Sequence, residues 1–274
     1  MIFPPLGPLL RRPLHLVVAI LFATYLLLYP GSLLLVALDR VPPWGVWIGG
    51  ALLILQGGLM GLWLVLNFGR WGMLAALLLL ALSWLIEHIG ATTGFPFGAY
   101  AYTDVLQPQI LGVVPLAIPF AWLLVVPAAL GAAELLVRGE SRTRTLLTAA
   151  AFTLLLDVTI EPFAVHISRY WVWSDAARGG YYGIPASNFV AWWFTGLLLS
   201  WLLLYMRQRA GRPAAIWPWL PLVLYLANLT MFVTVNLARG QLAAAVIGAL
   251  VLLLLACHQG APRLIRLLRA ARPS

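Results

Sequence analysis

The sequence predicts an all-α membrane protein, a polytopic bundle of about eight transmembrane helices with re-entrant or lid-like outer loops. Of the 274 residues, 63% are hydrophobic and only 9% are charged, whereas a soluble domain carries about a quarter charged residues. The mean hydropathy is +0.96. No repeat, low-complexity segment or soluble domain interrupts the apolar segments, so we expect residues 1–274 to form a single transmembrane domain.

Each predicted span is an apolar run of about 20 residues, the length that crosses a bilayer. The first run follows Arg11 and Arg12 and so resembles the start of a signal peptide. It is too long for a signal peptide, and no convincing small-residue cleavage site follows it, so we keep it as a helix. The eight runs cover 14–38, 46–66, 71–89, 113–137, 145–168, 188–206, 214–236 and 241–257.

The arginines predict the orientation. All 17 basic residues are arginines, and basic residues of short loops stay on the cytoplasmic side. With eight spans and the N-terminus inside, the outer side holds only Arg40, Arg169, Arg178 and Arg239. Both termini are therefore expected in the cytoplasm. The net charge of +9 follows from this topology and from anionic inner-leaflet lipid, so nucleic acid is not an expected partner.

Several function classes lack the residues that they need. The chain contains no lysine for a retinal Schiff base, and its single cysteine, Cys257, permits no internal disulfide. It has no glycine-rich dinucleotide motif and no P-loop. It also has no aspartate-rich pair for magnesium diphosphate, and its four histidines are too scattered for a di-iron histidine box. Acid–base chemistry without a cofactor or a metal, or no chemistry at all, is what remains.

Two long loops, 90–112 and 169–187, fall on the predicted outer side. They are the places where aromatic, glycine, proline and acidic residues mix densely. Irregular backbone near membrane depth is tolerated only where protein buries it or a cavity lies beside it. We therefore expect both loops to fold back over the bundle as a lid or a pocket wall.

Acidic residues gather in the same outer layer. Asp157 is the deepest, and Glu161 lies four residues later on the same helix face. Acids inside a membrane are functional by default, and one of two facing carboxylates is expected to hold a proton near neutral pH, as an acid catalyst requires. The acids of this layer are Glu87, Asp104, Asp157, Glu161 and Asp175.

A structural interpretation stands beside the functional one. Glu87 and Asp157 could be structural partners of Arg169, of Arg178 or of the polar side chains of neighbouring helices. The tryptophans and tyrosines of the two loops could be the aromatic belt of a membrane interface. The convergence of these residues from several predicted helices on one face favours a functional site.

At these segments the chain resembles the integral-membrane carotenoid biosynthesis family, whose characterised members are carotenoid 1,2-hydratases of the γ-carotene, lycopene and bisanhydrobacterioruberin type. The resemblance covers roughly residues 80–195. It rests on Glu87-x-x-Gly90-x-x-Thr93-Gly94-x-Pro96-Phe97-Gly98-x-Tyr100-x-Tyr102, Val114-Pro115, Pro119-x-x-Trp122, Asp157-x-x-x-Glu161-Pro162, Trp171-x-Trp173, Tyr182-Gly183-Ile184-Pro185 and Asn188-Phe189. The chain departs from the family around Gln107-Pro108 and Ala191-Trp192, which bears on the substrate more than on the reaction.

The resemblance implies a hydratase that adds water to the terminal C1=C2 double bond of a linear carotenoid and forms a tertiary alcohol. A carboxylic acid protonates the alkene, π-faces stabilise the carbocation, and a held water captures it. No cofactor is expected. The partners are the lipophilic carotenoid and membrane lipid, and the location is a prokaryotic cell membrane. The catalytic candidates are Glu87, Asp157, Glu161, Asp104, Asn188 and Tyr100, and the substrate-binding candidates are Phe97, Tyr102, Trp171, Trp173, Tyr182, Phe189, Trp192 and Asn228.

Three alternatives remain open from the residues. A small-solute or lipid transporter would use the same acids as a proton relay, but it predicts acids spread across the bilayer depth. A carotenoid cyclase or isomerase would pass through the same cation without adding water. A binding or assembly protein would keep its activity when Asp157 or Glu161 is replaced by alanine.

Overall fold

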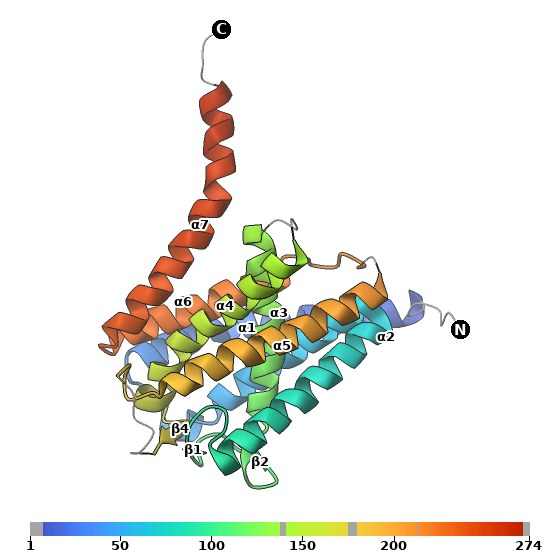
Figure 1. Ribbon diagram of the computed structural model, residues 1–274. Coiled ribbons are helices and arrows are strands. Elements are labelled where there is room, and N and C mark those ends of the chain that lie inside the picture. The colour runs from blue at the N-terminus through green and yellow to red at the C-terminus, as the bar shows by residue number, and fades with distance from the viewer. Residues whose placement is uncertain (1–7, 138–140, 175–179, 212, 271–274) are drawn as a thin grey trace.

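The computed structural model describes residues 8–137, 141–174, 180–211 and 213–270, and it confirms the predicted all-α membrane fold. Its helices pack into one bundle, from which most of the last helix projects, and the short strands gather at one end (Figure 1). The α-helices are α1 (Pro8–Ala37), α2 (Ile48–Thr93), α3 (Ala117–Val137), α4 (Arg142–Pro162), α5 (Ala186–Ala210), α6 (Leu220–Ala238) and α7 (Leu242–Ala270). A short 3-10 helix, η1 (Pro43–Gly45), precedes α2, and a π-helical turn, η2 (Phe163–Ile167), follows α4.

Six helical segments in the described part of the chain are long and apolar enough to cross a membrane. The chain is thus an integral membrane protein. One of these segments, Pro43–Thr93, has 51 residues. At about 1.5 Å per residue a straight helix of that length would be more than twice as long as the roughly 30 Å hydrocarbon core. It therefore has to bend or fold back.

The break in α2 is at Gly69, whose φ of 56° and ψ of −133° are not helical. The two arms of α2 run back along each other (Figure 1). A Cβ placed on Gly61 would lie 3.8 Å from the Cβ of Ala76, and one on Gly72 would clash with the backbone of Leu64. The two arms coincide with the predicted spans 46–66 and 71–89. With the shorter apolar stretch Leu242–His258 of α7, the fold agrees with about eight predicted crossings.

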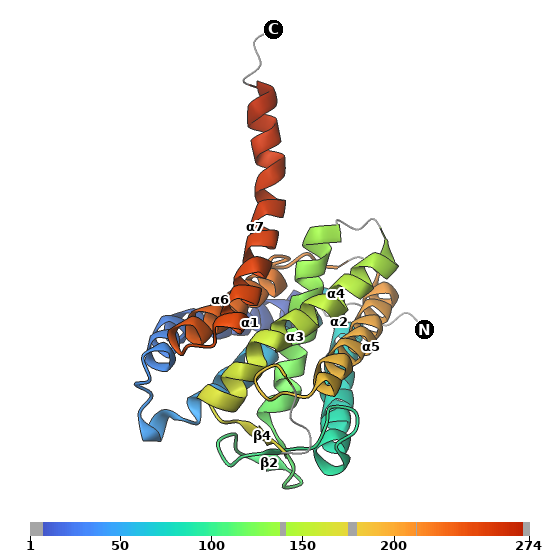
Figure 2. The ribbon, with the colours of Figure 1, turned by 60° about the vertical axis from the view of Figure 1, so that its left-hand side comes forward.

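The two outer loops pair with each other, as expected of a lid or pocket wall. Strand β1 (Tyr100–Tyr102) of the first loop runs antiparallel to β4 (Trp171–Trp173) of the second. A smaller pair joins β2 (Gln109–Ile110) to β3 (Val114–Pro115). Both pairs lie at the end of the bundle where α2 ends and α3 begins (Figure 2).

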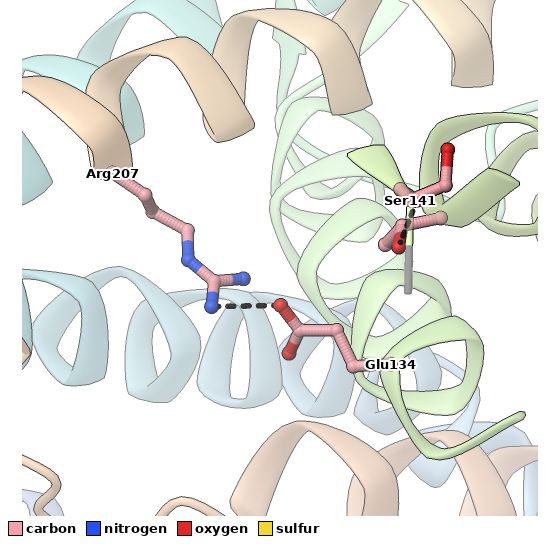
Figure 3. A network of polar contacts seen from close by, with 4 residues as sticks. Glu134, Ser141 and Arg207 are labelled. Atoms are coloured by element: carbon pink, nitrogen blue, oxygen red, sulfur yellow. Dashed lines mark hydrogen bonds and ion pairs between the residues drawn. The ribbon is translucent and has the colours of Figure 1, made fainter. Parts of the chain in front are cut away.

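The opposite end of the bundle is held by exposed charged contacts. Arg207 of α5 forms an ion pair of 2.8 Å with Glu134 of α3, and its guanidinium lies over the ring of Phe68. Figure 3 shows the pair close to Ser141, whose side chain accepts from the backbone N–H of Arg144 at the start of α4. Glu134 lies near the end of α3, whereas the strand pairs lie next to the start of that helix.

Some predicted boundaries differ from the structure. The helix α6 begins at Leu220 rather than at residue 214, because residues 213–219 run along the turn of α2, where the amide of Asn67 bonds the backbone of Ile216. The helix α7 continues past residue 257 to Ala270. Asp175 and Arg178, which entered the predictions of the outer layer and the orientation, lie outside the described residues.

We expect Gly69→Ala to lower stability by about 1–3 kcal/mol, since a Cβ strains a backbone with this φ and ψ. The measurement is the apparent melting temperature of the detergent-purified protein. Gly58→Ala is the matched control, because Gly58 lies on the same helix with open space around its Cα and alanine is favoured in helices. Equal melting temperatures for both variants would contradict the assignment of the turn.

Candidate active site

The β1–β4 pair points aromatic side chains from two distant loops in the same direction. Tyr100 lies opposite Trp173, and Tyr102 lies opposite Trp171. Successive strand residues face opposite sides, so Ala101 and Val172 between them are exposed while the four aromatics face the bundle. The strand pairing therefore delivers two phenols and two indoles to one place.

Glu87, on the last turns of α2, is buried and accepts three hydrogen bonds. The hydroxyl groups of Tyr100 and Tyr102 donate to its Oε2 at 2.7 and 2.8 Å. The indole Nε1 of Trp122, on α3, donates to its Oε1 at 2.8 Å. Three donors from two other segments thus hold this carboxyl in one position.

Glu161, on α4, is buried and is held in the same way. The Nε1 groups of Trp171 and Trp173 donate to its Oε2 at 3.2 and 3.1 Å. The side-chain amide of Asn188, on α5, donates to its Oε1 at 3.1 Å. One strand of the β1–β4 pair therefore supplies the donors for Glu87 and the other supplies donors for Glu161.

Asp157 lies one helical turn before Glu161 and shares its amide partner. The Nδ2 of Asn188 donates to Asp157 Oδ2 at 3.1 Å as well as to Glu161. Asp157 is fully buried, and its Oδ1 has no hydrogen-bond partner among the described residues. The expectation that Asp157 and Glu161 share a helix face is met, and Asn188 joins the two carboxyls.

Tyr100 and Tyr102 are neutral donors to Glu87. Burial raises the pKa of each phenol above the ordinary value of 10, and the nearby carboxylate of Glu87 raises it further. Neither hydroxyl therefore ionises in the pH range where proteins work. The donors of Glu87 remain in place at any physiological pH.

The acids Glu87 and Glu161 line a cavity of about 130 Å³ whose wall is mainly aliphatic and aromatic. The rings of Trp122 and Trp192 stack in this wall with centroids 4.1 Å apart. Phe97 is seated against Gly90, where any side chain would collide with its ring. No basic side chain lines this cavity in the described part of the chain. A positive charge that forms here meets carboxyl groups and π-faces.

The structure gathers most of the candidate residues around this cavity. Asp157 lies directly behind its wall, in contact with Asn188. The candidates that line the cavity are Glu87, Glu161, Asn188, Tyr100, Phe97, Tyr102, Trp171, Trp173, Trp192 and Asn228.

Three candidates lie elsewhere. Asp104 is exposed on the loop after β1 and does not reach the cavity. Tyr182 accepts a hydrogen bond from the backbone of Ala243 through its hydroxyl, and Phe189 packs its ring on Tyr181. These two residues hold the second outer loop against α7 and α5 and do not contact the cavity.

Trp122 and Gln56 are among the cavity-lining residues that were absent from the predicted set. Trp122 donates to Glu87 and stacks on Trp192, and its signal was its place in the family-like Pro119-x-x-Trp122 segment. Gln56 lines the cavity from the first arm of α2. A single glutamine in an apolar run was its only signal.

The structural interpretation of the acids is met in part, because Trp122 and Asn188, on neighbouring helices, donate to Glu87 and Asp157. The hydrogen bonds of Glu87 and Asp157 within the described residues go to phenols, an indole and an amide, with no contribution from Arg169. The indole N–H groups of Trp171 and Trp173 point at Glu161 rather than at an interface.

The fold and the site together define a polytopic membrane protein with an apolar cavity, two carboxyls in its wall and a third behind it. Residues 48–255 match the model of a family described as carotenoid biosynthesis protein. The chain belongs to this family. The matched range begins at α2 and contains the three carboxyls and the side chains that donate hydrogen bonds to them.

A curated relative adds a more specific likeness. Over 140 residues the chain is 35% identical to the bisanhydrobacterioruberin hydratase of Haloarcula japonica. The match covers 50% of this chain and 46% of the relative, so it spans less than half of that protein's length. No solved structure matches the chain.

We expect Trp173→Phe to lower stability by about 1–3 kcal/mol, because it keeps most of the ring but removes a donor from buried Glu161. For a chain of this size this corresponds to roughly 2–4 °C of melting temperature per kcal/mol. Trp201→Phe is the control, since the Trp201 side chain is half exposed on α5. A loss as large in the control would show that the indole bond to Glu161 contributes nothing specific.

The tyrosines predict a loss of stability in alkaline solution. A phenol with a raised pKa in the folded state stabilises the fold below about pH 10, and this stabilisation decreases as the pH rises above the unfolded value. The chain has no lysine, so tyrosines dominate this range. We expect Tyr102→Phe to flatten the fall in melting temperature between about pH 9 and 11. A slope unchanged from wild type would refute the assignment.

Proposed function

We propose that the protein is a cofactor-independent carotenoid hydratase that adds water to the terminal isopropylidene double bond of a linear carotenoid end. The observation that carries the proposal is the pairing of two hydrogen-bonded carboxyls with aromatic faces in one apolar cavity. The family and the 35% identical hydratase of Haloarcula japonica support it. The product would be a tertiary alcohol.

The proton donor that we assign is Glu161. It lines the cavity, whereas Asp157 lies behind Asn188. No basic side chain of the described residues lines the cavity, and burying two ionised carboxylates side by side is strongly unfavourable. We infer that Asp157 and Glu161 together hold a proton, as coupled carboxyl pairs do. Glu161 passes it to the alkene carbon, which leaves a tertiary carbocation at the neighbouring carbon.

The aromatic wall is suited to that carbocation. The stacked indoles of Trp122 and Trp192 and the ring of Phe97 offer π-faces, which attract cations. An arginine at this place would repel the cation. Its absence from the described wall of the cavity agrees with cation chemistry.

Water capture completes the reaction. Glu87 is the second carboxyl in the cavity wall, the hydroxyl of Tyr100 donates to it, and Asn188 lines the same cavity. In this proposal a water held there bonds to the carbocation, and Glu87 accepts the proton that the water loses. One water has then been added, and the proton returns from Glu87 to the Asp157–Glu161 pair.

A long polyene needs room beyond this cavity. A second cavity of about 230 Å³ shares Ser32, Gly49 and Tyr170 with the first and lies between α1, α2 and α6. Helix α1 is the least buried of the six candidate spans, since only 11% of its most apolar stretch is buried. We propose that the substrate enters sideways from the lipid beside α1. The cytoplasmic placement of both termini and the prokaryotic cell membrane remain predictions.

The test is expression of the full chain in a lycopene-producing bacterium, repeated with γ-carotene, with pigments analysed by chromatography and mass. We expect a more polar pigment that is heavier by one water. A new pigment of unchanged mass would identify a cyclase or an isomerase instead. Unchanged pigments with folded protein in the membrane would refute hydration of these substrates and favour the transporter alternative.

Acid substitutions test the assigned roles. We expect Glu161→Gln and Glu87→Gln to reduce the rate of hydration by about 100-fold or more, which is the usual contribution of a positioned acid or base. Asp157→Asn should reduce it less, because Asp157 does not line the cavity. Glu134→Gln, at the opposite end of the bundle, is the control. Full activity of Glu161→Gln would exclude Glu161 as the acid.

A further inference from the structure

A pair of buried amides forms a second polar place in the cavity wall. Gln56, on the first arm of α2, and Asn228, on α6, are 5% and 6% exposed, and both line the cavity. The Nδ2 of Asn228 donates to Gln56 Oε1 at 2.7 Å and to the carbonyl of Leu224 at 2.9 Å. The Nε2 of Gln56 donates to the carbonyl of Leu52 at 3.2 Å.

These bonds leave one donor and one acceptor open. A primary amide has two N–H donors and a carbonyl oxygen. Among the described residues, the second N–H of Gln56 and the Oδ1 of Asn228 have no hydrogen-bond partner, both side chains line the cavity, and the Oδ1 of Asn228 is not among the sealed atoms without a partner. An unmatched amide in apolar surroundings costs about 1–3 kcal/mol. The open pair matches a group that both donates and accepts, which is a hydroxyl.

The amide pair lies at a different depth from the acids. In the α2 hairpin Gly61 faces Ala76, so Gln56 faces the neighbourhood of residue 81, which lies six positions before Glu87. At about 1.5 Å per residue this separates the amides from Glu87 by roughly 9 Å along the helix. A substrate whose end reaches Glu87 and Glu161 passes the amides with a part of its chain farther inside.

We propose that Gln56 and Asn228 bind a hydroxyl group on the substrate, so that the cavity favours an acyclic isoprenoid that already carries an oxygen at a short distance from the reacting double bond. This rests on the proposed function for the double bond, while the hydroxyl site itself is a binding property. The alternative is that the amide pair only joins α2 to α6, as polar pairs do between membrane helices.

The test uses two small probes and a binding readout. Geraniol has an isopropylidene group at one end and a hydroxyl at the other, and its two ends are about as far apart as the acids and the amides. The control probe is the hydrocarbon in which hydrogen replaces the hydroxyl. Binding to purified full-length protein is followed through the fluorescence of the cavity tryptophans, in Glu161→Gln to prevent turnover.

We expect geraniol to bind roughly ten-fold more tightly than the hydrocarbon, the ratio for one or two net hydrogen bonds. In Gln56→Met and Asn228→Leu the two probes should bind alike. Asn236→Leu is the matched control, because Asn236 is a buried amide on the same helix that bonds Thr159 and does not line the cavity. It should keep the preference.

Equal binding of the two probes in the parent protein, or a preference that survives in both amide variants, would overturn the proposal and leave the pair as a helix contact. The probe comparison in the Glu161→Gln parent does not depend on the folding of either amide variant. The hydration assay with wild type is separate. A preference for geraniol without hydration of any pigment would refute the hydratase and keep the hydroxyl site.

Discussion

The site depends on hydrogen bonding between buried carboxyls and donors carried by one antiparallel strand pair. The strands β1 and β4 come from loops about 70 residues apart in sequence, yet their pairing places Tyr100 against Trp173 and Tyr102 against Trp171. The tyrosines hold Glu87 and the tryptophans hold Glu161. Without the strand pair, both carboxyls would lose donors in an apolar environment, where each unmatched polar group costs about 1–3 kcal/mol.

The choice of donor follows from the proposed chemistry. A membrane protein can satisfy a buried carboxylate with arginine, and this chain has 17 of them. In this cavity, phenol, indole and amide groups donate the hydrogen bonds to Glu87 and Glu161 instead. Such donors position a carboxyl without adding a permanent positive charge. In a site that forms a carbocation, this keeps the charge attracted to the acids and to the π-faces around it.

Much of the site was predictable because its chemistry is rare in a membrane. Glu87, Asp157 and Glu161 stood out as acids in apolar segments, and the four-residue spacing placed two of them on one face. The aromatic loops were distinguished by composition. Asp104, Tyr182 and Phe189 share that composition but lie away from the cavity, because neighbours in a loop sequence need not face the same side. Trp122 and Gln56 were missed because tryptophan and glutamine in a spanning helix have several structural uses.

The sequence by itself determined the membrane fold, its number of crossings, and the set of acids and aromatics available for chemistry, since hydropathy and helix periodicity are local properties. Tertiary structure alone decided which residues meet. The pairing of β1 with β4, the bridge of Asn188 between Asp157 and Glu161, and the contact of Gln56 with Asn228 all join segments far apart in the chain. Such contacts depend on packing across the whole bundle, and no local pattern in the sequence encodes them.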